Sequence, residues 1–141
     1  MKKLFSVITL SLALSVPMAS ASADSISERQ ANFKKSGQTL RMMRSQIAND
    51  DFQSIADGAK WLAEWGAAMP DHFPEGSGGG QTDALPSIWQ NFENFTALAN
   101  NFETASLALH DAALTNDVAA VQNAMQAVGR TCGACHQSYR K

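Results

Sequence analysis

The sequence predicts an all-α fold: an antiparallel four-helix bundle with a long loop between the second and third helices. Residue types that favour strands, Val, Ile and Tyr, are scarce, whereas Ala, Gln, Leu and Met are common. Apolar residues recur every three or four positions through four segments, which is the period of an amphipathic helix. Short links join these segments except at residues 70–86, where prolines and glycines exclude regular structure. Four helices with one long crossover make a bundle.

Residues 1–23 have the pattern of a cleaved export signal rather than of a folded segment. Lys2 and Lys3 form a positive start, residues 4–16 an apolar core, and Ala21-Ser22-Ala23 a small-residue cleavage site. The apolar core is shorter than the ~20 residues that a membrane-spanning helix needs. We therefore expect cleavage after Ala23, a periplasmic protein without membrane insertion, and a single domain over residues 24–141.

The first helix is expected over residues 25–48. It opens with a capping-box pattern, Ser25-x-x-Glu28. Four apolar residues recur every seven positions and form one stripe: Ile26, Phe33, Leu40 and Ile47. Gly37 lies one turn after Phe33, and a glycine inside a helix costs about 1 kcal/mol relative to alanine. Gly37 therefore indicates either a flat or bulky group close to the backbone or a tight helix crossing.

The second helix is expected over residues 51–69, with Asn49 or Asp50 as its cap and Pro70 as its stop. The third is expected over residues 87–113, where an aromatic-rich face recurs at helical spacing.

The fourth helix is expected to start at Asn116 or Asp117 and to run to about residue 139. Its apolar residues repeat at spacings of three and four, and this stripe includes Cys132 and Cys135. Both cysteines are therefore predicted to face inward.

The sequence Cys132-Gly133-Ala134-Cys135-His136 is C-x-x-C-H, the attachment motif of c-type haem. Two cysteines three residues apart on a helix face the same way, so both sulfurs can reach the two vinyl groups of one porphyrin. His136 then projects its imidazole toward the iron from the same side. Two free thiols would be unusual in an oxidising compartment, which also favours their use in haem attachment.

Other uses of the two cysteines fit less well. A thioredoxin-like pair lies near a βαβ pattern and at a helix start. A structural zinc site would need a fourth ligand. Three-residue spacing on a helix is poor geometry for a disulfide. The net charge of −2 and an isoelectric point near 5.8 argue against a nucleic-acid binder.

The chain resembles the cytochrome c′ family over nearly all of residues 25–141. Three matches carry the resemblance. They are the C-terminal CGACHQSYRK, which includes Tyr139 and Arg140, the pair Arg29-Gln30 followed by Phe33, and the segment Asp83 to Trp89 at the start of the third helix.

The resemblance implies one covalently attached haem c and a role for each matching residue. Cys132 and Cys135 would form the thioethers, and His136 would be the axial iron ligand. The remaining residues would surround the haem: Arg29 and Gln30 at its edge and propionates, Asp83 on the loop beside it, and Arg140 at its proximal face.

The sixth coordination position decides the chemistry. Close relatives of cytochrome c′ carry a methionine on the first helix and form low-spin, six-coordinate iron, whereas this position here is Phe33, which cannot bind iron. The resemblance therefore implies five-coordinate, high-spin iron in an electron carrier that also admits small gases such as NO or CO. The alternative is a low-spin electron carrier in which Met42 or Met43 binds the iron.

No enzymatic activity is expected, because peroxide cleavage needs a distal acid–base residue and none is predicted. A peroxidase or an NO reductase is therefore the weaker interpretation. The resemblance also implies redox partner proteins and a homodimer that packs through the first two helices, to which Trp61 or Trp65 could contribute.

Overall fold

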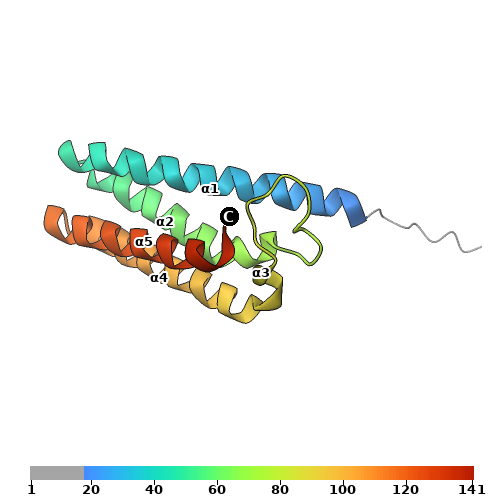
Figure 1. Cartoon of the computed structure of the whole chain (residues 1–141). Coiled ribbons are helices and arrows are strands. Elements are labelled where there is room, and N and C mark those ends of the chain that lie inside the picture. Colours follow the sequence, from blue (N-terminus) through green and yellow to red (C-terminus); the bar gives the residue numbers. More distant parts are fainter. Residues whose placement is uncertain (1–17) are drawn as a thin grey trace, which may run out of the picture.

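The computed structural model describes the backbone of residues 18–141 and the side chains of residues 23–141. Most of the predicted signal peptide lies outside the described residues, so cleavage after Ala23 stays a prediction. The described part is helical: α1 (Met18–Ala48), α2 (Phe52–Ala68), the 3-10 turn η1 (Met69–His72), α3 (Ser87–Gln90), α4 (Phe92–Leu114) and α5 (Val118–Tyr139). Figure 1 shows the four long helices side by side, with the loop before α3 crossing one end of the bundle. The predicted all-α bundle is confirmed.

Within residues 18–141, β-pairing is limited to one isolated bridge, between Ala84 and Arg140. None of the helices described there is long and apolar enough to cross a membrane.

α1 ends at the predicted residue but begins at Met18, seven residues before the predicted start. The added segment, residues 18–24, consists of Met, Ala, Ser and Asp without proline or glycine, so nothing in it breaks the helix.

α2 begins where the Asp51 carboxylate accepts a hydrogen bond from the Ser54 amide at 3.2 Å. The expected caps were therefore wrong by one or two residues. Asp50 instead forms the turn between the helices, with a φ of 53°, a conformation that Asp tolerates better than most residues. At the other end, Pro70 lies in η1, directly after α2.

The predicted third helix is interrupted at Asn91, which lies between α3 and α4 with φ −141° and ψ 58°. The Asn91 side chain accepts a hydrogen bond from the Asn94 amide at 3.4 Å and so caps α4. Asparagine is a strong N-cap residue, because its side chain replaces the missing backbone partner. A periodicity argument alone could not show this interruption.

α5 agrees with the prediction. Asp117 caps it by accepting hydrogen bonds from the amides of Ala119 and Ala120 at 2.8 and 3.1 Å.

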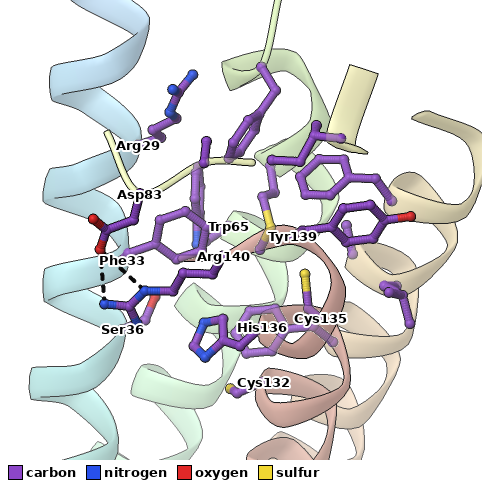
Figure 2. A pocket seen from close by; sticks show the side chains of 18 of the residues that line it. Arg29, Phe33, Ser36, Trp65, Asp83, Cys132, Cys135, His136, Tyr139 and Arg140 are labelled. Atoms are coloured by element: carbon purple, nitrogen blue, oxygen red, sulfur yellow. Dashed lines mark hydrogen bonds and ion pairs between the residues drawn. The ribbon is translucent and has the colours of Figure 1, made fainter. Parts of the chain in front are cut away.

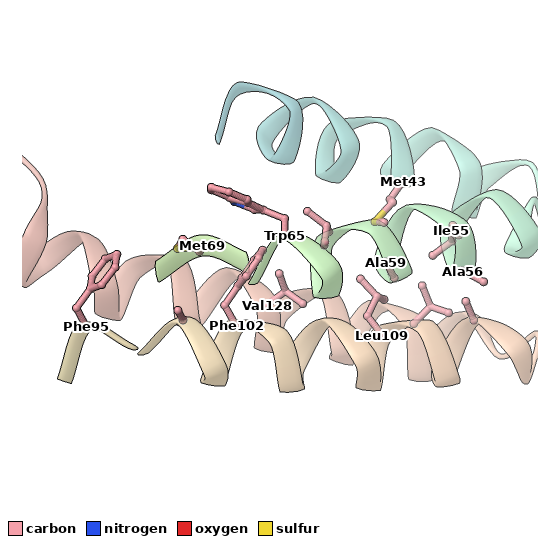
Figure 3. Close-up of a cluster of buried hydrophobic side chains, with 14 of the residues drawn as sticks. Met43, Ile55, Ala56, Ala59, Trp65, Met69, Phe95, Phe102, Leu109 and Val128 are labelled. Atoms are coloured by element: carbon pink, nitrogen blue, oxygen red, sulfur yellow. The ribbon is translucent and has the colours of Figure 1, made fainter. Parts of the chain in front are cut away.

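The apolar core follows the α2–α4–α5 side of the bundle, where the helices contact each other most extensively. Figure 3 shows these side chains, which include Ile55, Leu109 and Val128. Two glycines of α2 allow close helix crossings. A Cβ on Gly66 would lie 2.9 Å from the backbone nitrogen of Glu103 in α4, and one on Gly58 would lie 2.9 Å from Met43 Cε in α1.

Candidate functional site

A cavity of about 540 Å³ opens between the helices at the end of the bundle covered by the loop. Its wall is mainly apolar and is built by side chains from all four long helices, among them Phe33, Leu40, Trp65, Met69, Ile88, Phe95 and Phe102. Polar groups also line it, chiefly from α1, the loop and the C-terminus: Arg29, Gln30, Thr82, Asp83 and Arg140. Every predicted site residue therefore lines one cavity (Figure 2).

Cys132 and Cys135 lie one turn apart on α5, and both line the cavity. Both are free thiols in the structure. Burial raises the pKa of the Cys132 thiol. Burial, and then the neighbouring Cys132, raises the pKa of Cys135 to about 11. Both thiols are therefore protonated at neutral pH, and each can supply the sulfur and the hydrogen that add across a vinyl group.

His136 follows at the cavity wall with an exposed side chain. Burial of part of the ring, and then the positive charge of Arg140, lowers the pKa of His136. The imidazole is therefore neutral at pH 7 and keeps a nitrogen lone pair for a metal. Among residues 23–141, no group of three or more His, Cys, Asp or Glu side chains could hold a metal ion, so the zinc interpretation has no support there.

Phe33 forms the α1 side of the cavity. Its ring meets the Trp65 ring edge-on, with centroids 5.3 Å apart, and lies 6.4 Å from the ring of Phe73. The two methionines proposed as alternative ligands lie elsewhere: Met42 is 55% exposed, and Met43 is fully buried beside Gly58. Neither lines the cavity, so the structure does not support an iron bond from either of them.

Gly37 lines the cavity one turn beyond Phe33. A Cβ built there would meet only the end of the Arg41 side chain, at 3.4 Å. Gly37 therefore does not mark a helix crossing, in contrast to Gly58 and Gly66. Of the two explanations for this glycine, the structure favours close approach of a flat group to α1.

Arg29 is only 2% exposed and holds the loop. Its Nη1 donates to the backbone oxygen of His72 at 3.2 Å and to Ser77 Oγ at 2.8 Å. Its Nη2 donates to the backbone oxygen of Ser77 at 2.7 Å and to Thr82 Oγ1 at 3.1 Å. The guanidinium also lies 4.4 Å above the Phe73 ring. Burial lowers its pKa.

The C-terminus is tied to the same loop. Arg140 pairs with Asp83 at 3.3 Å, and the Lys141 amide donates to the Asp83 backbone oxygen at 2.9 Å. The Leu85 amide donates to the Tyr139 backbone oxygen at 3.0 Å. Gln30 adds one exposed bond, from Nε2 to the Gln81 backbone oxygen at 2.7 Å. The two residues expected on the loop and at the proximal face, Asp83 and Arg140, thus bind each other at the cavity rim.

Sequence reasoning did not assign several residues of the cavity wall to the site, among them Trp65 and Met69. Both lie on the α2 side and are nearly buried, 4% and 5% exposed. Their helical spacing predicted core packing, and nothing local distinguishes a side chain that faces a cavity from one that faces another helix. Trp65 had been considered for a dimer surface, and its burial excludes that role.

The residues present fit a c-type haem. The cavity volume lies within the ~300–1,000 Å³ of cofactor pockets, and the lining is apolar with a few polar groups. Two protonated thiols and a neutral imidazole meet on one wall, and a buried arginine supplies positive charge on another. Attachment needs thiols, iron binding needs the imidazole, and the carboxylates of a haem suit the arginine.

Comparison with known proteins gives a consistent result. The sequence model of the family described as Cytochrome C' matches residues 24–140. A cytochrome c′ of Rhodospirillum rubrum is 41% identical over 86 residues, which are 60% of this chain and 58% of that protein. The chain thus aligns with somewhat more than half of that relative's length. Cytochrome c-556 of Agrobacterium fabrum is 32% identical over 124 residues, 84% of this chain and 82% of that protein.

Solved structures resemble the whole bundle. The crystal structure of cytochrome c′ from Thermochromatium tepidum superimposes with a TM-score of 0.76 at 30% identity, covering 84% of this chain and 95% of that chain. The nitric oxide complex of a variant of cytochrome c prime from Alcaligenes xylosoxidans has a TM-score of 0.74 at 27% identity, covering 85% of this chain and 96% of that one.

Proposed function

The chain belongs to the cytochrome c′ family and is a haem c protein of the electron-transfer class, and we propose that it works in the periplasm as a five-coordinate electron carrier that also binds NO. One observation carries the proposal. Cys132, Cys135 and His136 line an apolar cavity whose α1 wall presents Phe33, a side chain that cannot bind iron. A bound haem would supply an iron that cycles between ferric and ferrous states, and Phe33 would give that iron no ligand.

The chain's own residues have separate tasks at this site. Cys132 and Cys135 would hold the cofactor covalently, and His136 would supply a nitrogen to its iron. Arg29 and Gln30 line the cavity, and we assign them to the propionates. Within the described residues no carboxylate pairs with the buried Arg29, so an anionic group of the cofactor would balance its charge.

Phe33 sets access to the open position. Its ring packs against Trp65 and Phe73, so the α1 side of a bound haem would face three apolar rings that offer a polar ligand no hydrogen bond from Phe33 or Phe73. A small neutral diatomic gas needs no hydrogen-bond partner and can enter when the ring turns. A related protein has been solved as its nitric oxide complex, which supports the same ligand class here.

We assign no catalytic reaction to the site. Among the described residues, the α1 wall of the cavity carries two basic side chains, Arg29 and Lys34, but no histidine or carboxylate that could act on peroxide. The terminal nitrogens of Arg29 donate to the loop. Electron exchange with redox partner proteins is the function that requires no such group.

We also propose a homodimer through α1 and α2. Trp61 is half-buried on α2, and Lys35 of α1 lies 3.9 Å above its ring, so the two helices share an aromatic surface there. A solved relative is described as having an unusual ligand-controlled dimer dissociation, which supports dimerisation as a property of such bundles. Sedimentation of the protein with and without NO tests this assignment.

The alternative, a low-spin carrier with a methionine ligand, is favoured by one observation only: Met69 lines the cavity. The decisive comparison is between the wild type, Phe33→Met and Met69→Leu, each produced with haem attached. We expect a high-spin spectrum for the wild type and for Met69→Leu, and a low-spin component in Phe33→Met. A low-spin wild type that becomes high-spin in Met69→Leu would overturn the five-coordinate assignment.

A further inference from the structure

Trp65 carries a buried hydrogen-bond donor that has no partner. The residue is 4% exposed. Among the buried side-chain nitrogen and oxygen atoms of the described residues, only Trp65 Nε1 makes no hydrogen bond. An indole N–H can only donate, so its acceptor must come from elsewhere. Buried polar groups are nearly always paired in folded proteins, and an exception calls for an explanation.

This unpaired donor lies at the same end of the cavity as the buried Arg29. The Trp65 ring lies 5.2 Å from the His72 ring, and the His72 backbone oxygen accepts from Arg29 Nη1 at 3.2 Å. Figure 2 shows Trp65 beside Phe33, with Arg29 beyond them and Cys132 and His136 on the far side of the cavity. Within the described residues, a buried N–H without an acceptor and a buried guanidinium without a carboxylate partner therefore lie near each other.

We propose that Trp65 Nε1–H donates a hydrogen bond to a carboxylate of the bound cofactor, a haem propionate. The inference rests on the proposed function, because it needs the haem in this cavity. The vinyl and propionate groups lie on opposite edges of the porphyrin. Attachment of the vinyl edge at Cys132 and Cys135 would leave the propionate edge to residues of the other walls, and Trp65 and Arg29 line the same cavity. Trp65 is then a positioning residue for the cofactor.

A second acceptor competes for the same proton. The Phe33 ring meets the indole edge-on at 5.3 Å, so the N–H could instead rest against the face of that ring. The two acceptors have opposite effects on the proton resonance: a carboxylate moves it downfield, and an aromatic face moves it upfield.

The test uses the full, haem-loaded chain in its reduced, CO-bound, diamagnetic form, with ¹⁵N-labelled tryptophan. The chain has three tryptophans, which provide matched references. Trp89 Nε1 donates to the backbone oxygens of Phe73 and Pro74 at 3.0 Å each, and Trp61 is half-buried on the outer side. Single Trp→Phe variants assign the three signals, and if Trp65→Phe fails to fold, the other two variants assign its signal by exclusion.

We expect the Trp65 N–H resonance downfield of the Trp61 N–H resonance. We also expect the Trp65 N–H to exchange with deuterium at about one tenth of the Trp61 rate or more slowly, because a charge-assisted hydrogen bond protects the proton. The propionate bending band in the resonance Raman spectrum should shift in Trp65→Phe and stay unchanged in Trp61→Phe. An upfield Trp65 signal that moves in Phe33→Leu, or one that exchanges as fast as Trp61, would overturn the inference. Absence of covalent haem would instead overturn the proposed function, so the two failures are distinguishable.

Discussion

Replacing Arg29 by methionine tests how the cavity end is built. Methionine keeps an unbranched apolar stem that can pack on Phe73, but it removes the guanidinium and all four of its hydrogen bonds. The acceptors left behind are two backbone oxygens and two hydroxyls of the loop. We therefore expect Arg29→Met to loosen the loop as well as to destabilise the bundle.

The loss of unfolding free energy depends on which of these acceptors solvent can reach after the substitution. Ser77 is fully buried and loses a donor to both its hydroxyl and its backbone oxygen. The bonds to His72 and Thr82 are only partly buried, so solvent can replace them. At about 1–3 kcal/mol for each of the two buried, unsatisfied Ser77 groups, Arg29→Met should lose about 2–6 kcal/mol of unfolding free energy. The neighbouring Gln30→Met, which loses one exposed bond, should lose less than ~1 kcal/mol.

Urea unfolding of the haem-loaded variants measures the difference, and limited proteolysis within residues 74–81 measures loop opening. Arg29→Lys keeps the charge with fewer donors and should fall between the wild type and Arg29→Met. Equal unfolding midpoints and equal cleavage rates for Arg29→Met and Gln30→Met would refute the view that Arg29 anchors the loop.

Three further substitutions separate packing from function. Gly66→Ala places a methyl group against the Glu103 backbone and should cost about 1–3 kcal/mol in thermal or urea unfolding; unchanged stability would contradict the close α2–α4 crossing. Gly37→Ala should stabilise the chain by up to ~1 kcal/mol yet reduce the yield of covalently attached haem, and an unchanged yield would argue against close approach of the porphyrin to α1. Asp83→Asn breaks an exposed ion pair with Arg140 and should change unfolding by less than ~1 kcal/mol, whereas a loss of several kcal/mol would show that this pair anchors the C-terminus.

The part of the site that could be predicted is the part that depends on local spacing. Cys132, Cys135 and His136 are fixed relative to one another by one helix, so their convergence on the cavity follows from the motif once the helix is known. The four long helices, the long loop and the start of α5 follow equally from periodicity and turn residues.

The part that could not be predicted depends on contacts between distant segments. Arg29 was recognised as a cavity residue, but its partners in the loop lie 43 to 53 residues away. Trp65 and Met69 looked like ordinary core residues, because helical spacing does not reveal whether a side chain faces a neighbour or a cavity. The interruption at Asn91 depended on competition between its side chain and the backbone, which the aromatic face of the segment concealed.

The most direct test of the account is the optical spectrum of the purified, haem-loaded protein in its oxidised, reduced and NO-treated forms. We predict haem that survives denaturation, a high-spin oxidised spectrum without a methionine–iron charge-transfer band, and a clear spectral change when NO is added. A charge-transfer band in the oxidised wild type, together with no response to NO, would contradict five-coordinate iron behind Phe33.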